Sequence, residues 1–405
     1  MKILILTTKF THVDGSPWLI SELADELCAQ GHQVTVLNID WEKSSSDLGK
    51  KILLSPGLNL ISIGAFQICG GAIGRLLKWL VSSLLAMPFL FKEFISGRRY
   101  DLLIGLSPCS ALWAALPFAA LISRFRFLIY WDFFPVHNLE IFSAVPVAVK
   151  NIAKVLERWL IGRFGHVGLM SERGVGFFKT YFNFLPQKSG EALPCPLILP
   201  IWTSVLSVQP CRESMRSFFS FESDRILFVF GGQITYGRGV RELCEAAVAA
   251  YQIDNRVALI ICGGGSMSGA VAEYALKNPE CIKYLGSLPR EKYLKVLAAA
   301  NVGVVATVPG VSAPAYPSKS LDYMACGIPI MAAVEDATDF GEIVERNGFG
   351  VACRAGDTES MKNCILSLSA NLDDHHLMGC RGKKFLAFHH SVFHASSIIT
   401  GVVRD

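Results

Sequence analysis

A lysine and an aspartate lie three residues apart where a short helix is expected to begin. Pro317 and Ser318 lead into Lys319, and the apolar run behind them ends at Cys326–Gly327. A helix start presents N–H groups with partial positive charge, and an adjacent ammonium adds to the attraction for a phosphate. Asp322 falls on the same helical face, where its carboxylate can accept hydrogen bonds from ribose hydroxyls. The spacing therefore predicts a cradle for a nucleoside diphosphate.

Each residue alone has a simpler explanation. A lysine at a helix start is usually a solvated surface residue, and an acid in the first turn is most often a partner of the helix dipole. Three glycine-rich loops favour the binding interpretation, because each follows an expected strand and glycine lets a ligand approach the backbone. These loops contain Gly231–Gly232 with Arg238 further along, Gly263–Gly265, and Val308–Gly310.

The elements that must position these loops alternate regularly in the second half of the chain. Apolar runs of strand length are separated by segments with helical periodicity. The expected strands are Ile226–Phe230, Val257–Cys262, Ile282–Leu285, Val302–Thr307, Ile328–Ala332 and Gly350–Ala352, and the last expected helices are Thr358–Leu368 and Leu377–His389. This alternation predicts a doubly wound parallel sheet.

The first half of the chain follows the same alternation less regularly. Ile3–Leu6 and Gln33–Ile39 are expected strands on either side of a helix over Pro17–Gln30. The uncharged stretch Leu102–Ser123 is long enough to span a bilayer. Ser107–Pro108 divides it into a strand and a helix, so it predicts a buried strand–helix unit instead of a membrane span.

A chain of 405 residues is too long for one ordinary hydrophobic core and fits two α/β domains. The periodicity lapses among the prolines near residue 200, which indicates a boundary there. We predict an N-terminal domain over 1–205, a linker over 206–224, a second domain over 225–385, and a C-terminal helix over 386–405 that returns to the first domain. The expected fold class is α/β, with two doubly wound Rossmann-like domains facing across a cleft.

The composition limits the possible partners and the cell compartment. Lys and Arg number 38 against 34 Asp and Glu, and they are scattered, which suits an anionic ligand and disfavours nucleic acid. None of the 12 cysteines is in a Cys-x-x-Cys pair, and several lie inside apolar segments, so we expect reduced thiols in a cytoplasmic protein. The first residues are expected to form a strand, not a signal peptide.

Several segments resemble the family 4 glycosyltransferases, which have the GT-B fold and retain anomeric configuration. Pro317–Pro329 is similar to their donor-site signature and Gly31–Val36 to their second N-terminal strand. Phe230–Gly239 resembles the loop that carries a basic phosphate ligand, and Tyr284–Pro289 the segment that contacts the base. The resemblance implies that the second domain binds a nucleotide-sugar donor and the first an acceptor. The donor-binding residues are then expected to be Gly15, Gly232, Arg238, Gly264, Leu288, Ser318, Lys319, Ser320 and Asp322.

Two departures from the family pattern affect the expected chemistry. The commoner pattern has two glutamates eight residues apart, whereas this chain has Pro314 and Asp322, as in a Pro-Ser-Lys subgroup that lacks the first acid. Gln233 stands where many relatives carry arginine, so phosphate binding is expected to depend on Arg238 and Lys319. Asp-x-Asp occurs nowhere in the chain, so we expect a metal-independent reaction with no cofactor beyond the nucleotide-sugar substrate. Arg238 and Lys319 would stabilise the departing diphosphate.

The acceptor side is expected in the first half of the chain. Gly15 lies in the loop after the first strand and allows close approach to the diphosphate. Asp132 and His137 follow another strand end and are the acceptor-side catalytic candidates; a loop that caps its own helix is the alternative. Residues 73–99 are apolar with basic residues along the edges, which suits a helix lying on an anionic membrane surface. A buried helix is the competing interpretation.

The expected function is transfer of a sugar, with retention, to a glycan or lipid-linked acceptor in cell-surface polysaccharide synthesis, at the inner face of the cell membrane. A sugar-nucleotide epimerase on the same fold is one alternative, although it would prefer catalytic acids near the base-contacting loops. A non-catalytic protein that binds a nucleotide or a partner enzyme is the other, and Pro314 in place of an acid favours it.

Overall fold

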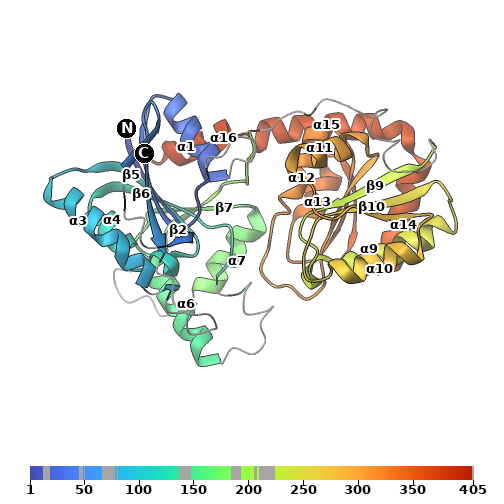
Figure 1. Ribbon diagram of the computed structural model, residues 1–405, viewed down its shortest axis with the longest axis horizontal. Helices are drawn as coiled ribbons and strands as arrows, with labels where there is room; N and C mark the ends of the chain where they lie inside the picture. Colours follow the sequence, from blue (N-terminus) through green and yellow to red (C-terminus); the bar gives the residue numbers. More distant parts are fainter. Residues whose placement is uncertain are drawn as a thin grey trace. The chain divides into compact units, whose positions relative to one another are not determined.

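The computed structural model describes residues 1–11, 19–44, 49, 51–65, 78–79, 81–134, 136, 147–183, 193–204, 208 and 224–403. The chain divides into two compact units, both built of helices and strands (Figure 1). Unit 1 consists of Met1–Pro200 with Val392–Asp405, and unit 2 of Ile201–Ser391. The sequence prediction of two α/β domains with doubly wound sheets is confirmed.

Unit 1 is built around a mainly parallel sheet. Its described strands have the order β3-β4-β2-β1-β5-β6-β7-β8, and only the β3–β4 pair among them is antiparallel. The strands are β1 (Lys2–Thr7), β2 (Gln33–Ser44), β3 (Lys51–Ser55), β4 (Leu58–Ala65), β5 (Tyr100–Leu106), β6 (Ser123–Ile129), β7 (His166–Leu169) and β8 (Cys195–Ile198). The neighbouring strands β1 and β5 contain the buried apolar runs Ile3–Leu6 and Leu102–Ile104, as expected of parallel strands covered on both faces.

The helices of unit 1 include the end of the chain. They are α1 (Leu19–Ala29), η1 (Ser83–Ala86), α3 (Met87–Ile95), η2 (Cys109–Leu112), α4 (Ala115–Leu121), α6 (Val147–Ile161), α7 (Glu172–Phe182) and α16 (Val392–Gly401). The last helix packs beside the first (Figure 1), and the Gln30 amide donates a 2.7 Å hydrogen bond to the Ser396 hydroxyl. The chain therefore re-enters unit 1 after Ser391.

The uncharged stretch Leu102–Ser123 does not form one long helix. It forms most of β5, the short η2, then α4 and the first residue of β6. The described residues contain no helix that is both long and apolar enough to cross a bilayer. The predicted strand–helix unit is confirmed.

Unit 2 has a fully parallel sheet among its described strands, in the order β11-β10-β9-β12-β13-β14. The strands are β9 (Ile226–Gly231), β10 (Val257–Cys262), β11 (Ile282–Tyr284), β12 (Val302–Ala306), β13 (Ile330–Val334) and β14 (Gly350–Arg354). The helices are η4 (Tyr236–Arg238), α9 (Val240–Tyr251), α10 (Ser268–Lys277), α11 (Arg290–Ala299), α12 (Lys319–Cys326), α13 (Phe340–Arg346), α14 (Thr358–Ala370), η5 (Leu372–Asp374) and α15 (His375–His389). In Figure 1, α9, α10 and α14 lie on one side of this sheet, and α11, α12 and α15 on the other.

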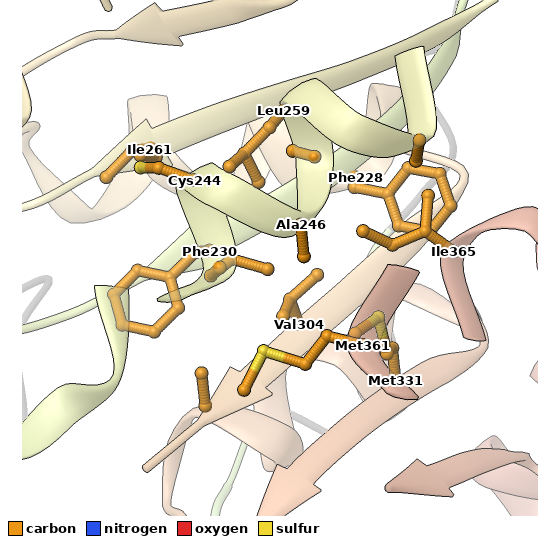
Figure 2. Close-up of a cluster of buried hydrophobic side chains, with 14 of the residues drawn as sticks. Phe228, Phe230, Cys244, Ala246, Leu259, Ile261, Val304, Met331, Met361 and Ile365 are labelled. Carbon is orange, nitrogen blue, oxygen red and sulfur yellow. The ribbon is translucent and has the colours of Figure 1, made fainter. Parts of the chain in front are cut away.

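The core under α9 and α14 fixes the central strands of unit 2. Alternate residues of β9, Phe228 and Phe230, point into it with Leu259 and Ile261 of β10 (Figure 2). Met361 of α14 packs against the same cluster. Burying a side chain of this size stabilises the fold by about 1.5–3 kcal/mol, so the ends of β9 and β10 are held firmly for the loops that follow.

Candidate functional site

The strand order of unit 2 reverses between β9 and β12. From β9 the chain builds outward through β10 and β11, and then returns to place β12 on the other side of β9. Loops after the strands diverge at such a point, and in open α/β sheets the crevice that this leaves binds ligands. The loop after β9 contains Gly231 and Gly232, and the loop after β12 leads to Lys319 at the start of α12.

Lys319 reaches from α12 to the loop after β9. Its Nζ is buried, has no hydrogen-bond partner among the described residues, and lies 3.5 Å from the centroid of the Phe230 ring. A Cβ added to Gly232 would come within 3.6 Å of the same nitrogen. Burial lowers the pKa of Lys319 well below its ordinary value, and the nearby charge of Arg238 lowers it further. The two predicted cations are therefore close enough to repel each other.

A buried ammonium without a hydrogen-bond partner is costly, and a single aromatic face offsets only part of that cost. Desolvation of an unpaired charge costs several kcal/mol, whereas a desolvated cation–π contact returns about 2 kcal/mol. Two neighbouring cations add repulsion. An anion near Lys319 and Arg238 would remove both penalties, so the electrostatics of this site favour an anionic ligand.

The glycines of these loops serve two different purposes. A Cβ on Gly231 would lie 2.0 Å from the Tyr293 hydroxyl, and one on Gly263 would lie 1.8 Å from the carbonyl oxygen of Gly232. Gly264 likewise leaves room for the Ser287 hydroxyl, at 2.6 Å from its would-be Cβ. These three glycines let the loops pack closely. Gly232 is exposed with φ +121°, and its would-be Cβ meets only Lys319, so its open side is available to a ligand.

Arg238 is held against the end of β12. It is the exposed last residue of η4, and its N–H donates to the Thr235 carbonyl oxygen at 3.1 Å. Gly239 follows with φ +57°, and a Cβ there would come within 2.3 Å of the Thr307 carbonyl oxygen. This close approach needs glycine and places Arg238 beside the loop that leads to Lys319.

The two serines at the start of α12 differ in burial and in hydrogen bonding. The Ser320 side chain is fully buried and its hydroxyl donates to the Pro317 carbonyl oxygen at 2.8 Å, so it stabilises the helix start. The N–H groups of Ser320 and Leu321 also bond back, to Pro317 and Ser318. The Ser318 side chain is exposed and makes no capping hydrogen bond. Of the two predicted serines, only Ser318 presents its hydroxyl to solvent.

Asp322 has a partner that the sequence motif did not indicate. Both of its carboxylate oxygens accept from the guanidinium of Arg290, each at 2.6 Å. Arg290 is the first residue of α11 and follows directly on the loop that contains Leu288, which is half-buried. The predicted ribose-binding acid is thus held by the residue that directly follows the segment predicted to contact the base.

Only part of the predicted acceptor site lies within the described residues. Asp132 is exposed just beyond β6, and its N–H lies 3.5 Å from the Ser107 hydroxyl at the end of β5. Gly15 and His137 lie outside the described residues. Asp132 and Ser107 therefore mark the carboxyl edge of the unit 1 sheet.

Sequence reasoning missed a buried carboxylate near that edge. Glu157 of α6 is fully buried and accepts hydrogen bonds from the N–H groups of Cys109 and Ser110, at 2.7 and 2.9 Å. Burial raises the pKa of Glu157 to about 7, against the opposing effect of these hydrogen bonds. The carboxylate caps η2 directly after the Ser107 loop. No local motif marks it, because its partners are more than forty residues away in the chain.

Unit 2 is a doubly wound domain with a buried lysine and close-packed glycine loops at the reversal of its strand order, which is where open α/β sheets bind ligands. Residues 225–371 match the family model described as Glycosyl transferases group 1. The match and the fold together support a glycosyltransferase of the GT-B type. The narrower assignment to family 4 and its Pro-Ser-Lys subgroup stays a prediction.

Solved structures share this fold over the whole chain at low sequence identity. Sucrose-phosphate synthase from Thermosynechococcus elongatus is 17% identical with a TM-score of 0.70, covering 100% of this chain and 98% of that one. WaaG, a glycosyltransferase involved in lipopolysaccharide biosynthesis, is 13% identical with a TM-score of 0.67, at 98% and 100% coverage. HepE of Anabaena in complex with UDP-glucose is 14% identical with a TM-score of 0.66, at 100% and 99% coverage. No curated protein matches the sequence.

Proposed function

We propose that this protein transfers a sugar from a nucleotide-sugar donor to a glycan or lipid-linked acceptor, with retention of anomeric configuration and without a metal ion. The buried ammonium of Lys319, unpaired among the described residues and close to Arg238, carries the proposal. HepE was solved with UDP-glucose, which supports a nucleotide-sugar donor.

The proposed chemistry follows from the charge of the leaving group. Breaking the bond between sugar and phosphate leaves a nucleoside diphosphate with added negative charge. Lys319, Arg238 and the start of α12 supply positive charge where that charge develops. A preorganised donor in such a site contributes about 3–4 kcal/mol to transition-state stabilisation. These groups can replace the divalent ion, while the leaving phosphate accepts the proton of the attacking hydroxyl.

The acceptor is proposed to be presented at a membrane surface through the segment of residues 73–99, of which 73–77 and 80 lie outside the described residues. Within the described part of that segment α3 lies beside α4, where the rings of Phe94 and Phe118 are in contact. On these helices and the residues that flank them, large apolar side chains and basic side chains are exposed: Leu84, Phe91, Phe94, Ile95 and Leu121 with Lys92, Arg98, Arg99 and Arg124. This combination suits an anionic leaflet, and we propose a cytoplasmic enzyme at the inner face of the membrane. The role of WaaG in lipopolysaccharide biosynthesis fits a role in cell-surface polysaccharide synthesis.

The test is a transfer assay on the purified protein with labelled nucleotide sugars, bacterial membranes and EDTA. We expect release of the nucleoside diphosphate and a labelled lipid-extractable product, both retained in EDTA. Lys319→Ala should lower the rate by about a hundredfold to a thousandfold. The matched control is Lys277→Ala, because Lys277 is exposed in the same unit and pairs with Glu273; it should behave as wild type.

Other outcomes separate the alternatives. Interconversion of the nucleotide sugar without an acceptor would identify an epimerase. Tight nucleotide binding with no turnover would identify a non-catalytic binding protein. Full dependence on added magnesium would remove the proposed role of Lys319 and Arg238.

A further inference from the structure

The ion pair between Arg290 and Asp322 joins two helices that follow different loops of the candidate site. Arg290 donates through both terminal nitrogens, one to each carboxylate oxygen, at 2.6 Å. The side chain of Asp322 is 13% exposed and that of Arg290 is 40% exposed. A bidentate pair of this kind fixes the plane of the carboxylate as well as its charge.

Arg290 is poorly placed to stabilise its own helix. It is the first residue of α11, and a cation there is opposed by the positive end of the helix dipole. Asp322, in the first turn of α12, is favourably placed and needs no arginine for that purpose. The position of Arg290 is therefore better explained by what it does to Asp322 than by helix stability.

Asp322 keeps acceptor capacity beside its bond to arginine. A carboxylate offers about four lone-pair sites, and the two hydrogen bonds from Arg290 use one on each oxygen. With the plane of the group fixed and most of its surface buried, the remaining sites point in a restricted direction. Adjacent hydroxyls on a ribose match such a pair of acceptors.

We propose that Arg290 is a positioning residue, which holds the Asp322 carboxylate so that it accepts from the ribose hydroxyls and makes the site selective for ribonucleoside over 2′-deoxyribonucleoside diphosphates. The inference rests on the proposed donor site and adds to it a residue and a specificity. The competing role for the pair is a clamp between α11 and α12 that contributes only to stability.

The experiment measures binding constants by calorimetry for UDP, ADP and GDP, and then for the 2′-deoxy form of the strongest ligand. Wild type should prefer the ribonucleotide by about tenfold to a hundredfold, the range for a lost hydrogen bond to a charged group. Asp322→Asn should reduce this preference, and Arg290→Met should reduce it to a similar extent. Arg290→Lys keeps the positive charge but cannot donate to both carboxylate oxygens in the planar geometry of a guanidinium. Its preference for the ribonucleotide should therefore fall between those of Arg290→Met and wild type. Arg241→Met removes an exposed arginine paired with Glu245 in the same unit and should leave the preference unchanged.

The double variant Arg290→Met with Asp322→Asn tests whether the arginine acts through the carboxylate. Its preference should equal that of Asp322→Asn alone, because two residues that act as one unit are not additive. If Arg290→Met lowers the unfolding temperature but keeps the wild-type preference, the pair is only a clamp and the inference is overturned. Equal affinity of wild type for the ribonucleotide and for its 2′-deoxy form would also overturn the inference. Failure of every nucleotide to bind would overturn the proposed function as well.

Discussion

Nucleotide binding should be accompanied by proton uptake at Lys319. In the free protein, burial and the charge of Arg238 lower the pKa of this lysine well below the ordinary value of 10.5. A bound diphosphate adds negative charge beside the ammonium and raises that pKa again. Between the two pKa values the free lysine is neutral and the bound lysine is charged, so about one proton enters with each nucleotide. The affinity should therefore fall as the pH rises through this window, by up to about tenfold per pH unit.

The assay is calorimetric titration of the free protein with UDP at several pH values, in two buffers with different ionisation enthalpies. The difference between buffers gives the number of protons taken up. Lys319→Met keeps an unbranched side chain but has no titratable group. Any proton uptake that remains when this variant binds UDP is therefore assigned to the phosphates of the nucleotide. The exposed Lys277→Met is the matched control and should match wild type. Equal proton uptake by wild type and Lys319→Met at every pH would refute the reasoning.

Three further outcomes are expected. Lys319→Met should raise the unfolding temperature of the unliganded protein and weaken nucleotide binding, because it removes a buried amino group that has no hydrogen-bond partner among the described residues; a lower unfolding temperature would contradict this. Gly231→Ala should destabilise unit 2 by about 1–3 kcal/mol in urea unfolding, since its Cβ would lie 2.0 Å from the Tyr293 hydroxyl, whereas the open Gly237 should tolerate alanine. Glu157 has a pKa raised to about 7 from 4.5, so its contribution to stability is fully present below pH about 4.5 and is lost as the pH rises through about 7. Glu157→Gln should flatten that decline in thermal unfolding, and an unchanged profile would contradict the assignment.

The strands of unit 2 were predictable because buried parallel strands are continuous apolar runs. Val257–Cys262 was expected and is the observed β10. Ile328–Ala332 was expected for β13, which instead begins at Ile330. Gly327 ends α12 in the left-handed conformation, and the chain needs the next two residues to enter the sheet.

Unit 1 was harder to predict for an identifiable reason. The strand that Asp132 was expected to follow is β6, which runs over Ser123–Ile129. Arg124 and Arg126 interrupt its apolar pattern, although both belong to the strand. The antiparallel β3–β4 pair was not predicted, because its outer strand is mostly exposed and lacks a buried run.

Local motifs revealed the parts of the site that one loop or one helical turn creates. The start of α12 and the glycine loops were read from neighbouring residues in the sequence. Arg290 was not predicted as part of the site, because 32 residues separate it from Asp322. Its pairing with Asp322 is determined by how α11 packs on α12. Such a pair becomes visible only after the sheet has brought the two helices together.

The two charged residues in the first turn of α12 differ in whether the protein supplies them with a partner, and this difference indicates the function of each. Asp322 already has its counter-charge within the protein, which suits a group that must hold one orientation before the ligand arrives. Lys319 is buried without a hydrogen-bond partner among the described residues, and its amino nitrogen lies 3.5 Å from the centroid of the Phe230 ring. A stable fold tolerates such a group when a ligand completes it, because the cost is then recovered in binding energy. Lys319, whose buried amino group has no hydrogen-bond partner among the described residues, is therefore the better guide to the ligand, and the partner that we propose for it is an anion.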